Sequence, residues 1–288
     1  MDMFDNQKTV KELKKSFLKW AGGKRKLVPT IMGRFPKQGK RFIDVFAGSG
    51  VVALNADYPK IIYNDFNTDL YLIWQCLQKY GQSFINECKE IFTSKNNTKE
   101  MYYKLRDEFN RTKRKRRKAV LFIYLNRYGF NGLCRYNAKG GFNVPIGRYK
   151  KPYFPENELT SCLRKVVNWK LCNKDFRDIF KTVKDGDVVY CDPPYLPLSD
   201  TSDFTSYSAG GFSLQDQIDL AKCASKAAQK GAIVVISNHD TWCARQIYGN
   251  MFNRKISSIS VSRTISSNAD SRKPVKEVIV VFTKDKGN

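Results

Sequence analysis

Short runs of apolar, often β-branched residues recur along the chain and are bounded by turn-forming residues, which predicts the strands of a sheet. These runs lie near residues 41–45, 61–65, 169–172, 187–191, 232–236, 254–261 and 276–282. Apolar residues three or four positions apart predict helices between several of them, near 24–34, 51–54, 156–166 and 213–229. Strands that alternate with helices are typical of an α/β fold built on one sheet.

Residues 68–155 break this alternation. Helical spacing there predicts helices near 68–81, 83–92, 98–110 and 119–126. The following stretch, 127–150, carries arginine, asparagine and aromatic residues around glycine turns, which predicts a loop plus a β-hairpin. We therefore expect residues 1–67 and 156–288 to form one α/β domain into which residues 68–155 are inserted. A segment rich in Ser, Thr, Asp and Gly at 196–212 predicts a mobile flap.

The charge of the chain narrows the choice of partner. The formal net charge is +24 over 288 residues, so a polyanion is the first expected partner, and a merely soluble basic surface is the alternative. Residues 111–118 hold seven basic side chains in eight positions, a pattern suited to backbone phosphates. No apolar signal region, membrane-spanning run or amphipathic anchor is evident, which predicts a cytoplasmic protein without a membrane partner.

The cysteine pattern argues against two kinds of site. Eight cysteines form no C-x-x-C pair, and His239 is the one histidine of the chain. Zinc sites and disulfide frameworks both need closely patterned ligands or pairs. We therefore expect reduced thiols and no metal.

The segment from Asp187 to Tyr195 is the first candidate for chemistry. It is an apolar strand that ends at Asp192-Pro193-Pro194-Tyr195, and two consecutive prolines hold the backbone stiff. The carboxylate of Asp192 and the carbonyl of Pro193 are acceptors suited to an exocyclic amine, and the Tyr195 ring suits stacking on a base. A structural strand end is the alternative interpretation.

Two further segments suit a nucleoside cofactor. Phe46, Gly48 and Gly50 form a strand–turn–helix junction with a shortened glycine pattern, which suits a cofactor without a pyrophosphate. Asp65 ends the next strand, where an acid can accept hydrogen bonds from ribose hydroxyls. Earlier in the chain, Trp20 and Lys24 flank a glycine pair, either as a wall and a carboxylate partner or as parts of a plain loop.

The stretch 127–150 carries side chains that suit nucleic-acid bases. Arginine can pair bidentately with guanine and asparagine with adenine, while a ring or a leucine can wedge between bases. An ordinary hairpin core would show cleaner alternation of apolar and polar residues. We therefore interpret this stretch as a base-reading surface.

These motifs, in this order, resemble the Dam-type DNA adenine-N6 methyltransferases, a class alpha amino-methyltransferase family specific for GATC. The resemblance rests on residues 17–24, 46–50, 125–155, 192–195 and 236–240, and covers roughly residues 16 to 283. It implies a Rossmann-like sheet for S-adenosylmethionine with an inserted DNA-recognition unit of helices and a β-hairpin. It further implies a monomer that methylates the adenine of duplex GATC after flipping it out of the stack.

The resemblance also assigns roles to single residues. It places Trp20, Lys24 and Asp65 at the cofactor, Asp175 and Phe176 on the cofactor's adenine, and Asp192 between cofactor and target base. For DNA, it implies base reading by Lys19, Leu133, Arg135 and Pro145, filling of the gap by Phe130 and Asn131, and backbone contacts by Arg127, Asn137, Arg148 and Lys150. Phe130 departs from the family, which often has tyrosine there.

Two other functions remain open from the residues alone. The Asp-Pro-Pro-Tyr chemistry also serves an amine on RNA or an amide on a protein glutamine. A catalytically silent GATC-binding regulator is the alternative from a different class of protein.

Overall fold

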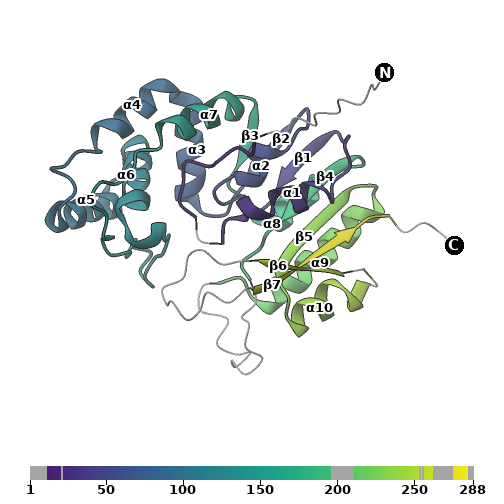
Figure 1. The fold of residues 1–288 in the computed structure, drawn as a ribbon. Coiled ribbons are helices and arrows are strands. Elements are labelled where there is room, and N and C mark those ends of the chain that lie inside the picture. The colour runs from purple at the N-terminus through teal and green to yellow at the C-terminus, as the bar shows by residue number, and fades with distance from the viewer. Residues whose placement is uncertain are drawn as a thin grey trace, which may run out of the picture.

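The computed structural model describes residues 12–20, 22–195, 211–252, 254, 256–261 and 275–284, so that most of the expected flap at 196–212 lies outside the described residues. The described strands form one seven-stranded sheet (Figure 1). Their order is β3 (Trp169–Cys172), β2 (Ile61–Asn64), β1 (Arg41–Asp44), β4 (Asp187–Cys191), β5 (Ile233–His239), β7 (Val275–Phe282) and β6 (Ile256–Val261). The seven predicted strands are thereby confirmed.

The sheet is parallel from β3 to β5, and β7 runs antiparallel between β5 and β6. All five residues of β4 are buried, as expected for a central strand covered on both faces. The chain moves outward from β1 in both directions, first to β2 and later to β4. The β1–β4 border is therefore the switch point at which α/β sheets open a ligand crevice at the carboxyl ends of their strands.

Helices cover both faces of the sheet. The helices outside the insertion are η1 (Lys24–Leu27), α1 (Val28–Met32), α2 (Val51–Asn55), α7 (Glu156–Val166), α8 (Phe176–Lys181), α9 (Leu214–Gln229), α10 (Trp242–Tyr248) and η4 (Asn250–Phe252), of which α7 packs on the inserted segment. One apolar cluster joins α8, α9 and α10 to one face, through residues such as Ile43, Val189 and Leu220. The strand–helix alternation is the Rossmann-like architecture that the pattern predicts.

The insertion is a helical lobe beside the sheet, formed by α3 (Thr68–Tyr80), α4 (Gln82–Glu90), α5 (Lys99–Arg111) and α6 (Lys115–Tyr128) (Figure 1). Asn67 caps α3 by accepting from the amides of Asp69 and Leu70, and Gly81 ends it with φ +53°. α6 begins at Lys115 rather than at 119 as predicted, because the basic residues form its first turn, which is partly exposed.

A second apolar cluster runs without a break from the other face of the sheet into this lobe. Trp74 of α3 joins the two parts, since its ring centroid lies 4.9 Å from that of Phe17 and 5.4 Å from that of Trp169. The lobe and the sheet therefore share a core.

Residues 129–147 return from α6 as a loop that includes η2 (Phe130–Gly132). The expected hairpin is irregular, since two isolated bridges close it, Gly129 to Ile146 and Tyr136 to Phe142. Asn131 adopts φ +52°, which is uncommon for a residue other than glycine and turns the chain out of an extended ladder. The loop is held against α5, where Tyr102 Oη donates to the Val144 carbonyl at 3.0 Å.

Candidate active site

The carboxylate of Asp192 follows directly after β4 and is held from two sides. Its Oδ1 accepts a hydrogen bond from Ser237 Oγ at 3.0 Å, and its Oδ2 lies 3.1 Å from Lys24 Nζ. Ser237 sits on the neighbouring strand β5, where the Tyr190 hydroxyl lies 2.9 Å from Ser237 Oγ. The carboxylate is thus oriented at the β1–β4 crevice, where parallel strands place ligands.

Lys24 is the cation at the centre of this cluster. Only 5% of Lys24 is exposed, its Nζ donates to the Gly22 carbonyl at 3.1 Å, and it lies 3.8 Å from Glu277 Oε2. Lys24 therefore links the carboxylates of Asp192 and Glu277 in one charged cluster.

The Tyr195 ring closes one side of the same cluster. Lys24 Nζ lies 4.5 Å from the ring centroid, and the Tyr195 hydroxyl donates to Glu277 Oε2 at 3.0 Å. The His239 ring meets it edge-on, with centroids 4.3 Å apart. Burial, followed by the charges of Asp192 and Glu277, raises the pKa of Tyr195 well above its usual range, so the phenol stays protonated.

The double proline is anchored by a buried glutamine. Gln217 Nε2 donates to the Pro194 carbonyl at 2.8 Å, and Gln217 Oε1 accepts from Asn238 Nδ2 at 3.2 Å and from the Tyr248 hydroxyl. Cys191, just before the turn, is buried in the core, and burial raises its pKa well above the usual value. A thiolate nucleophile beside Asp192 is therefore disfavoured.

A cavity of about 970 Å³ lies beside this turn. Its lining brings together most of the residues that the sequence nominates for the cofactor and for catalysis: Trp20, Lys24, Phe46, Gly48, Asp65, Asp175, Phe176, Asp192, Pro193, Pro194 and Tyr195. Cys134 and Tyr136 of the 129–147 loop line the same cavity. The loop that we interpret as base-reading therefore reaches the candidate site.

The glycine turn after β1 is packed too tightly for side chains. Gly48 has φ +52°, and a Cβ there would lie 2.9 Å from Trp20 Nε1. Gly50, which follows at φ +71°, would place a Cβ 2.7 Å from the Trp74 ring. The turn thus needs glycine for both conformation and space.

Asp65 stands opposite this turn, at the end of β2. Its Oδ2 accepts from the Gly48 amide at 2.8 Å, and its Oδ1 accepts from the Asn67 amide at 2.8 Å. Burial raises the pKa of Asp65, while these two hydrogen bonds oppose the shift. The acid therefore supports the glycine turn as well as facing the cavity.

Three phenyl rings form the far end of the cavity. The centroid of Phe176 lies 5.8 Å from that of Phe46 and 5.4 Å from that of Phe212, and Phe46 and Phe212 are 5.4 Å apart. The sequence pattern places Phe212 in the flap and gives it no role in the site. Asp175 caps α8 beside them by accepting from the Arg177 amide at 2.8 Å.

A buried acid to which the sequence motifs give no role lies beneath the site. Asp44 ends β1 and is 1% exposed, its Oδ2 accepts from the Ala53 amide at 3.3 Å, and its Oδ1 has no hydrogen-bond partner among the described residues. Burial first, and then the nearby charge of Asp192, raises the pKa of Asp44 well above its usual range.

The candidate DNA-contact residues differ in exposure. Phe130, Asn131 and Leu133 are half-buried on the 129–147 loop. The exposed residues on this loop or just after it are Arg135, Asn137, Pro145, Arg148 and Lys150. Arg135 Nε donates to Asn143 Oδ1 at 2.8 Å, which aligns its guanidinium along the loop. Asn137 Oδ1 accepts from the amides of Lys139 and Gly141, so its side chain shapes the turn.

Lys19 is locked to this loop from the N-terminal segment. Its amide donates to Asn126 Oδ1 at 2.9 Å, and its Nζ lies 3.8 Å from the centroid of the Tyr149 ring. Partial burial, and then the charge of Arg127, lowers the pKa of Lys19.

Arg127 lies deeper than a phosphate contact requires. It is 7% exposed and its guanidinium donates to the Phe17 carbonyl, and burial lowers its pKa. This position argues against the expected backbone contact, and it makes Arg127 a structural link between α6 and the N-terminal segment.

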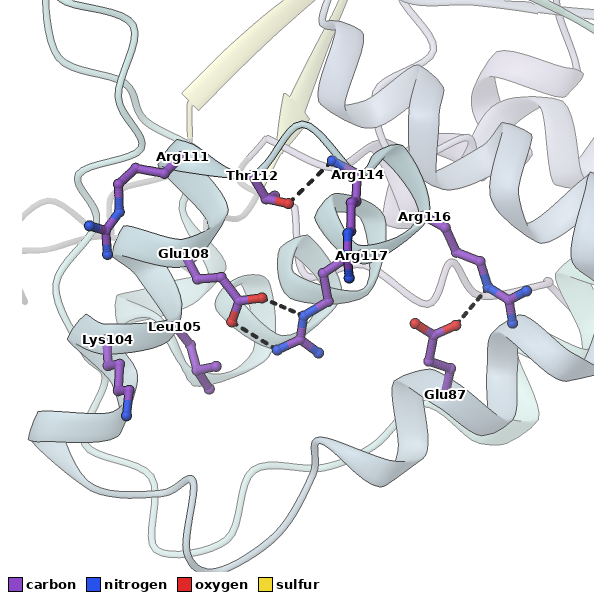
Figure 2. A pocket seen from close by; sticks show the side chains of 9 residues that line it. All are labelled: Glu87, Lys104, Leu105, Glu108, Arg111, Thr112, Arg114, Arg116 and Arg117. Carbon is purple, nitrogen blue, oxygen red and sulfur yellow. Dashed lines mark hydrogen bonds and ion pairs between the residues drawn. The ribbon is translucent and has the colours of Figure 1, made fainter.

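A basic cavity of about 720 Å³ lies where α5 turns into α6, beyond the core of the lobe (Figure 2). Arg117 pairs with Glu108 at 2.7 Å and Arg116 with Glu87 at 2.6 Å. The other cations of its lining, Lys104, Arg111 and Arg114, have no carboxylate within 4.0 Å among the described residues. The first turn of α6 holds no acidic residue, and no side chain caps it. These features together suit a phosphate.

The described residues show neither a metal-ligand cluster nor a membrane-spanning helix. Within the described ranges, no three His, Cys, Asp or Glu side chains gather so that they could hold a metal ion. The helices of the same ranges include none that is long and apolar enough to span a membrane.

Comparison with known proteins assigns this architecture to a family. The model of the D12 class N6 adenine-specific DNA methyltransferases matches residues 20–265. The DNA adenine methylase of Escherichia coli K12 is 43% identical over 268 residues, which cover 93% of this chain and 95% of that protein. The DNA adenine methylase of Serratia marcescens is 42% identical over 269 residues, covering 93% and 98%.

A solved precorrin-6y C5,15-methyltransferase from Geobacter metallireducens aligns with a TM-score of 0.39 and 10% identity, over 90% of this chain and 87% of that one, which is too distant to bear on function. The family model and the close relatives decide the matter. The chain belongs to the D12 class N6 adenine-specific DNA methyltransferases, and it methylates adenine in DNA.

Proposed function

We propose that the protein transfers a methyl group from S-adenosylmethionine to N6 of the adenine in duplex GATC, after that base has left the stack. One observation carries this proposal: Asp192 and the glycine turn open into a single cavity that the 129–147 loop also lines. The donor, the acceptor amine and the base-reading surface can therefore meet at one place.

The cavity fits the proposed cofactor in shape and charge. The acids Asp65 and Asp175 offer acceptors for hydroxyls and an amine, and the Phe46, Phe176 and Phe212 rings offer apolar faces for an adenine. The carboxylates of Asp65, Asp175 and Asp192 line the cavity, and negative charge there suits a sulfonium cation. When bound there, S-adenosylmethionine supplies an electrophilic methyl group on sulfur.

The side chains of the catalytic turn prepare the amine. The adenine amine is a weak nucleophile because its lone pair is delocalised into the ring. We infer that Asp192 and the Pro193 carbonyl accept hydrogen bonds from its two hydrogens and so free the lone pair. With S-adenosylmethionine bound, this lone pair would attack the methyl carbon and the thioether would leave, while the proton that the nitrogen loses would pass by way of the Asp192 carboxylate to solvent. Positioning and electrostatics carry this step.

The target base must reach Asp192 from inside a duplex. Extrusion of a base costs a few kcal/mol, and a stacking surface together with a plug for the gap offset it. We assign the stacking ring to Tyr195, which lines the cavity, and the filling of the gap to Phe130 and Asn131, which are half-buried on the loop. Phenylalanine keeps the ring that the family often supplies as tyrosine.

We assign DNA recognition to residues 68–155 and catalysis to residues 1–67 and 156–288, in a monomer. Base edges would be read by Lys19, Leu133, Arg135 and Pro145, and phosphates by Asn137, Arg148 and Lys150. The basic cavity at the α5–α6 turn would hold further phosphates outside the target site.

Methylation with labelled S-adenosylmethionine tests the whole proposal. We expect label in duplexes with GATC, on N6 of adenine alone, and none in a duplex whose two strands read GTTC and GAAC. Label on RNA or on protein, or an absence of label with tight GATC binding, would instead support the alternative functions.

A further inference from the structure

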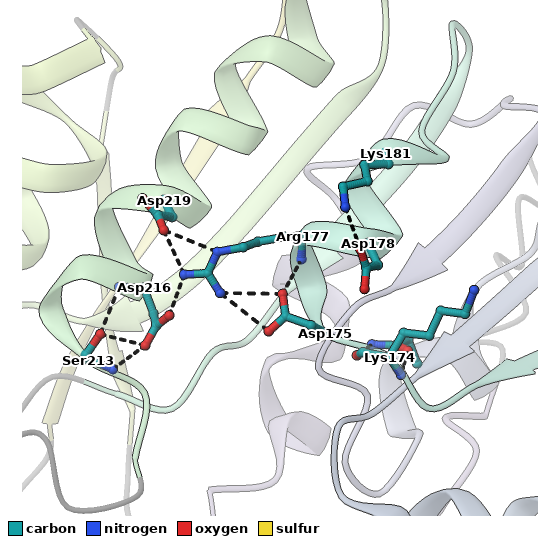
Figure 3. A network of polar contacts seen from close by, with 9 residues as sticks. Lys174, Asp175, Arg177, Asp178, Lys181, Ser213, Asp216 and Asp219 are labelled. Carbon is teal, nitrogen blue, oxygen red and sulfur yellow. Dashed lines mark hydrogen bonds and ion pairs between the residues drawn. The ribbon is translucent and has the colours of Figure 1, made fainter.

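Arg177, at the start of α8, is surrounded by three carboxylates (Figure 3). Its Nη2 lies 2.5 Å from Asp216 Oδ1 and 2.7 Å from Asp219 Oδ2, and its Nη1 lies 3.4 Å from both oxygens of Asp175. Its guanidinium also stacks 4.3 Å from the centroid of Phe176. The arginine therefore touches both side chains that are proposed to hold the cofactor's adenine.

The other ends of this network lie on α9. Asp216 belongs to a capping box, in which it exchanges hydrogen bonds with Ser213 across the first turn of that helix. Gln217, the next residue, holds the Pro194 carbonyl of the catalytic turn. One turn of α9 thus contacts the adenine end of the cavity through Arg177 and the methyl-transfer end through Gln217.

We propose that Arg177 is a positioning residue, which fixes the Asp175 carboxylate for the cofactor's 6-amino group and ties that carboxylate to the first turn of α9. The inference rests on the proposed use of S-adenosylmethionine, and it adds a residue to which the family motifs give no role. Arg177 acts through Asp175 and Phe176 and takes no part in the transfer itself.

The charges and geometry explain why an arginine stands here. A planar guanidinium can serve several carboxylates with fixed directions, which a lysine ammonium cannot. Partial burial would lower the pKa of Arg177, but hydrogen bonds to Asp216 and Asp219 outweigh it and raise the pKa. Arg177 is one cation among three acids, so the Asp175 carboxylate can still accept a hydrogen bond from a ligand. A ligand amine can donate this bond, whereas a ligand carbonyl cannot.

Ligand binding without turnover provides the test. S-Adenosylhomocysteine carries the 6-amino group, whereas S-inosylhomocysteine carries a 6-carbonyl that would face the carboxylate. We expect the parent protein to prefer the amino form by about tenfold or more, because the carbonyl leaves an acceptor facing an acceptor. Isothermal titration of both ligands gives this ratio directly.

The variants then separate positioning from general damage. In Arg177→Ala, we expect the ratio to fall by about three- to tenfold, and Arg177→Lys should recover part of it. Asp175→Ala should bring the ratio near one, and adding Arg177→Ala to that variant should change it no further. Lys181→Ala is the matched control, since Lys181 pairs with Asp178 on the same helix at 2.7 Å and no dashed line joins it to Asp175 (Figure 3).

Hydrogen exchange tests the link to α9. In the parent protein, S-adenosylhomocysteine should slow exchange in residues 214–220, and in Arg177→Ala this slowing should be lost even at saturating ligand. An unchanged ratio in both Arg177 variants, or an unchanged exchange pattern, would overturn the inference while leaving the proposed function intact. If neither ligand binds the parent protein, the proposed cofactor itself is wrong.

Discussion

Lys24 and Asp192 form an ion pair across 3.1 Å that joins the N-terminal segment to the end of the central strand β4. The lysine is 5% exposed, so the pair is shielded from solvent and salt on its cationic side. Together with Ser237, it fixes the orientation of the Asp192 carboxylate. Such preorganisation is the main electrostatic contribution an enzyme can make to a polar transition state.

Replacement of Asp192 by asparagine should remove methyl transfer while sparing binding. The amide keeps the shape but turns a donor toward the substrate amine and leaves Lys24 short of one counter-charge. We expect the rate at saturating substrates to fall by roughly 10²- to 10⁴-fold. Rapid-quench assays measure the rate, and titrations check DNA and cofactor affinity. Asp185→Asn is the control, because Asp185 is exposed and pairs with Lys40; equal activity in both variants would refute the role of Asp192.

Replacement of Arg135 by alanine should relax the choice of one base pair. The side chain is held along the loop by Asn143 and lies outside the core, so its removal should leave the fold intact. We expect about 1–3 kcal/mol less discrimination at one guanine of GATC. Competition between GATC and singly substituted duplexes measures this. Lys139→Ala, an exposed change on the same loop, should weaken all duplexes alike; discrimination that falls equally in both variants would contradict the assignment.

Neutralising the basic cavity should weaken DNA binding without regard to sequence. In the double variant Arg111→Gln and Arg114→Gln, affinity for GATC and non-GATC duplexes should fall together. The slope of log affinity against log salt should decrease by about 0.9 for each phosphate that the variant no longer neutralises. The control is the double variant Lys60→Gln and Lys230→Gln. These two exposed lysines precede the amino ends of β2 and β5, whereas the cavity beside Asp192 lies at the carboxyl ends of the strands. A weakening confined to GATC would speak against backbone contacts.

The glycine turn offers a matched test of packing. Gly50 and Gly140 both have positive φ, of +71° and +76°, but a Cβ at Gly50 would lie 2.7 Å from Trp74, whereas nothing lies within 4 Å at Gly140. Alanine at Gly140 should cost about 1–2 kcal/mol of unfolding free energy from conformation alone. Alanine at Gly50 should cost about 1–3 kcal/mol more from overpacking. Urea unfolding of the two variants measures the difference in unfolding free energy. Equal losses would mean that the Trp74 ring moves aside without cost.

Asp44 should make stability depend on pH. Burial raises the pKa of Asp44 in the folded protein above its ordinary value of 3.8. The folded state therefore binds this proton more tightly, and the parent protein loses stability as pH rises from the unfolded pKa to the folded one. Asp44→Asn, which keeps an acceptor for Ala53, should escape this loss. Urea midpoints between about pH 4 and pH 8 should show an advantage for the variant that grows with pH; parallel curves would show that Asp44 does not titrate differently on folding.

Local sequence signals predicted the strands, the Asp192 turn and the glycine turn, because each depends on residues close together in the chain. Long-range partners could not be predicted in this way. Ser237, Gln217 and Glu277 reach Asp192, Pro194 and Tyr195 only because the fold brings β5, α9 and β7 near the carboxyl end of β4. The same limit applies to Arg127, whose burial depends on Phe17, 110 residues earlier.

The packing across the boundary of the inserted lobe also depends on long-range partners that local sequence does not predict. A composition shift near residue 68 marks it, but Trp74 packs on Phe17 and Trp169 across that boundary. Periodicity indicates which face of a helix is apolar, not which partner covers it. The irregularity of the hairpin could not be predicted from the sequence either, because Asn131 at φ +52° interrupts the extended backbone.

The apolar cluster that passes unbroken from the sheet into the lobe limits how sequence preference can be re-engineered. A chimaera that exchanged all of residues 68–155 for a relative's segment would leave Phe17 and Trp169 facing a foreign helix. An exchange confined to the 129–147 loop would disturb a smaller part of this cluster, chiefly Phe142 and Val144, and keep α3 native. Successful grafts should therefore be small, and evolution of new targets in this protein should proceed through the loop before the helices.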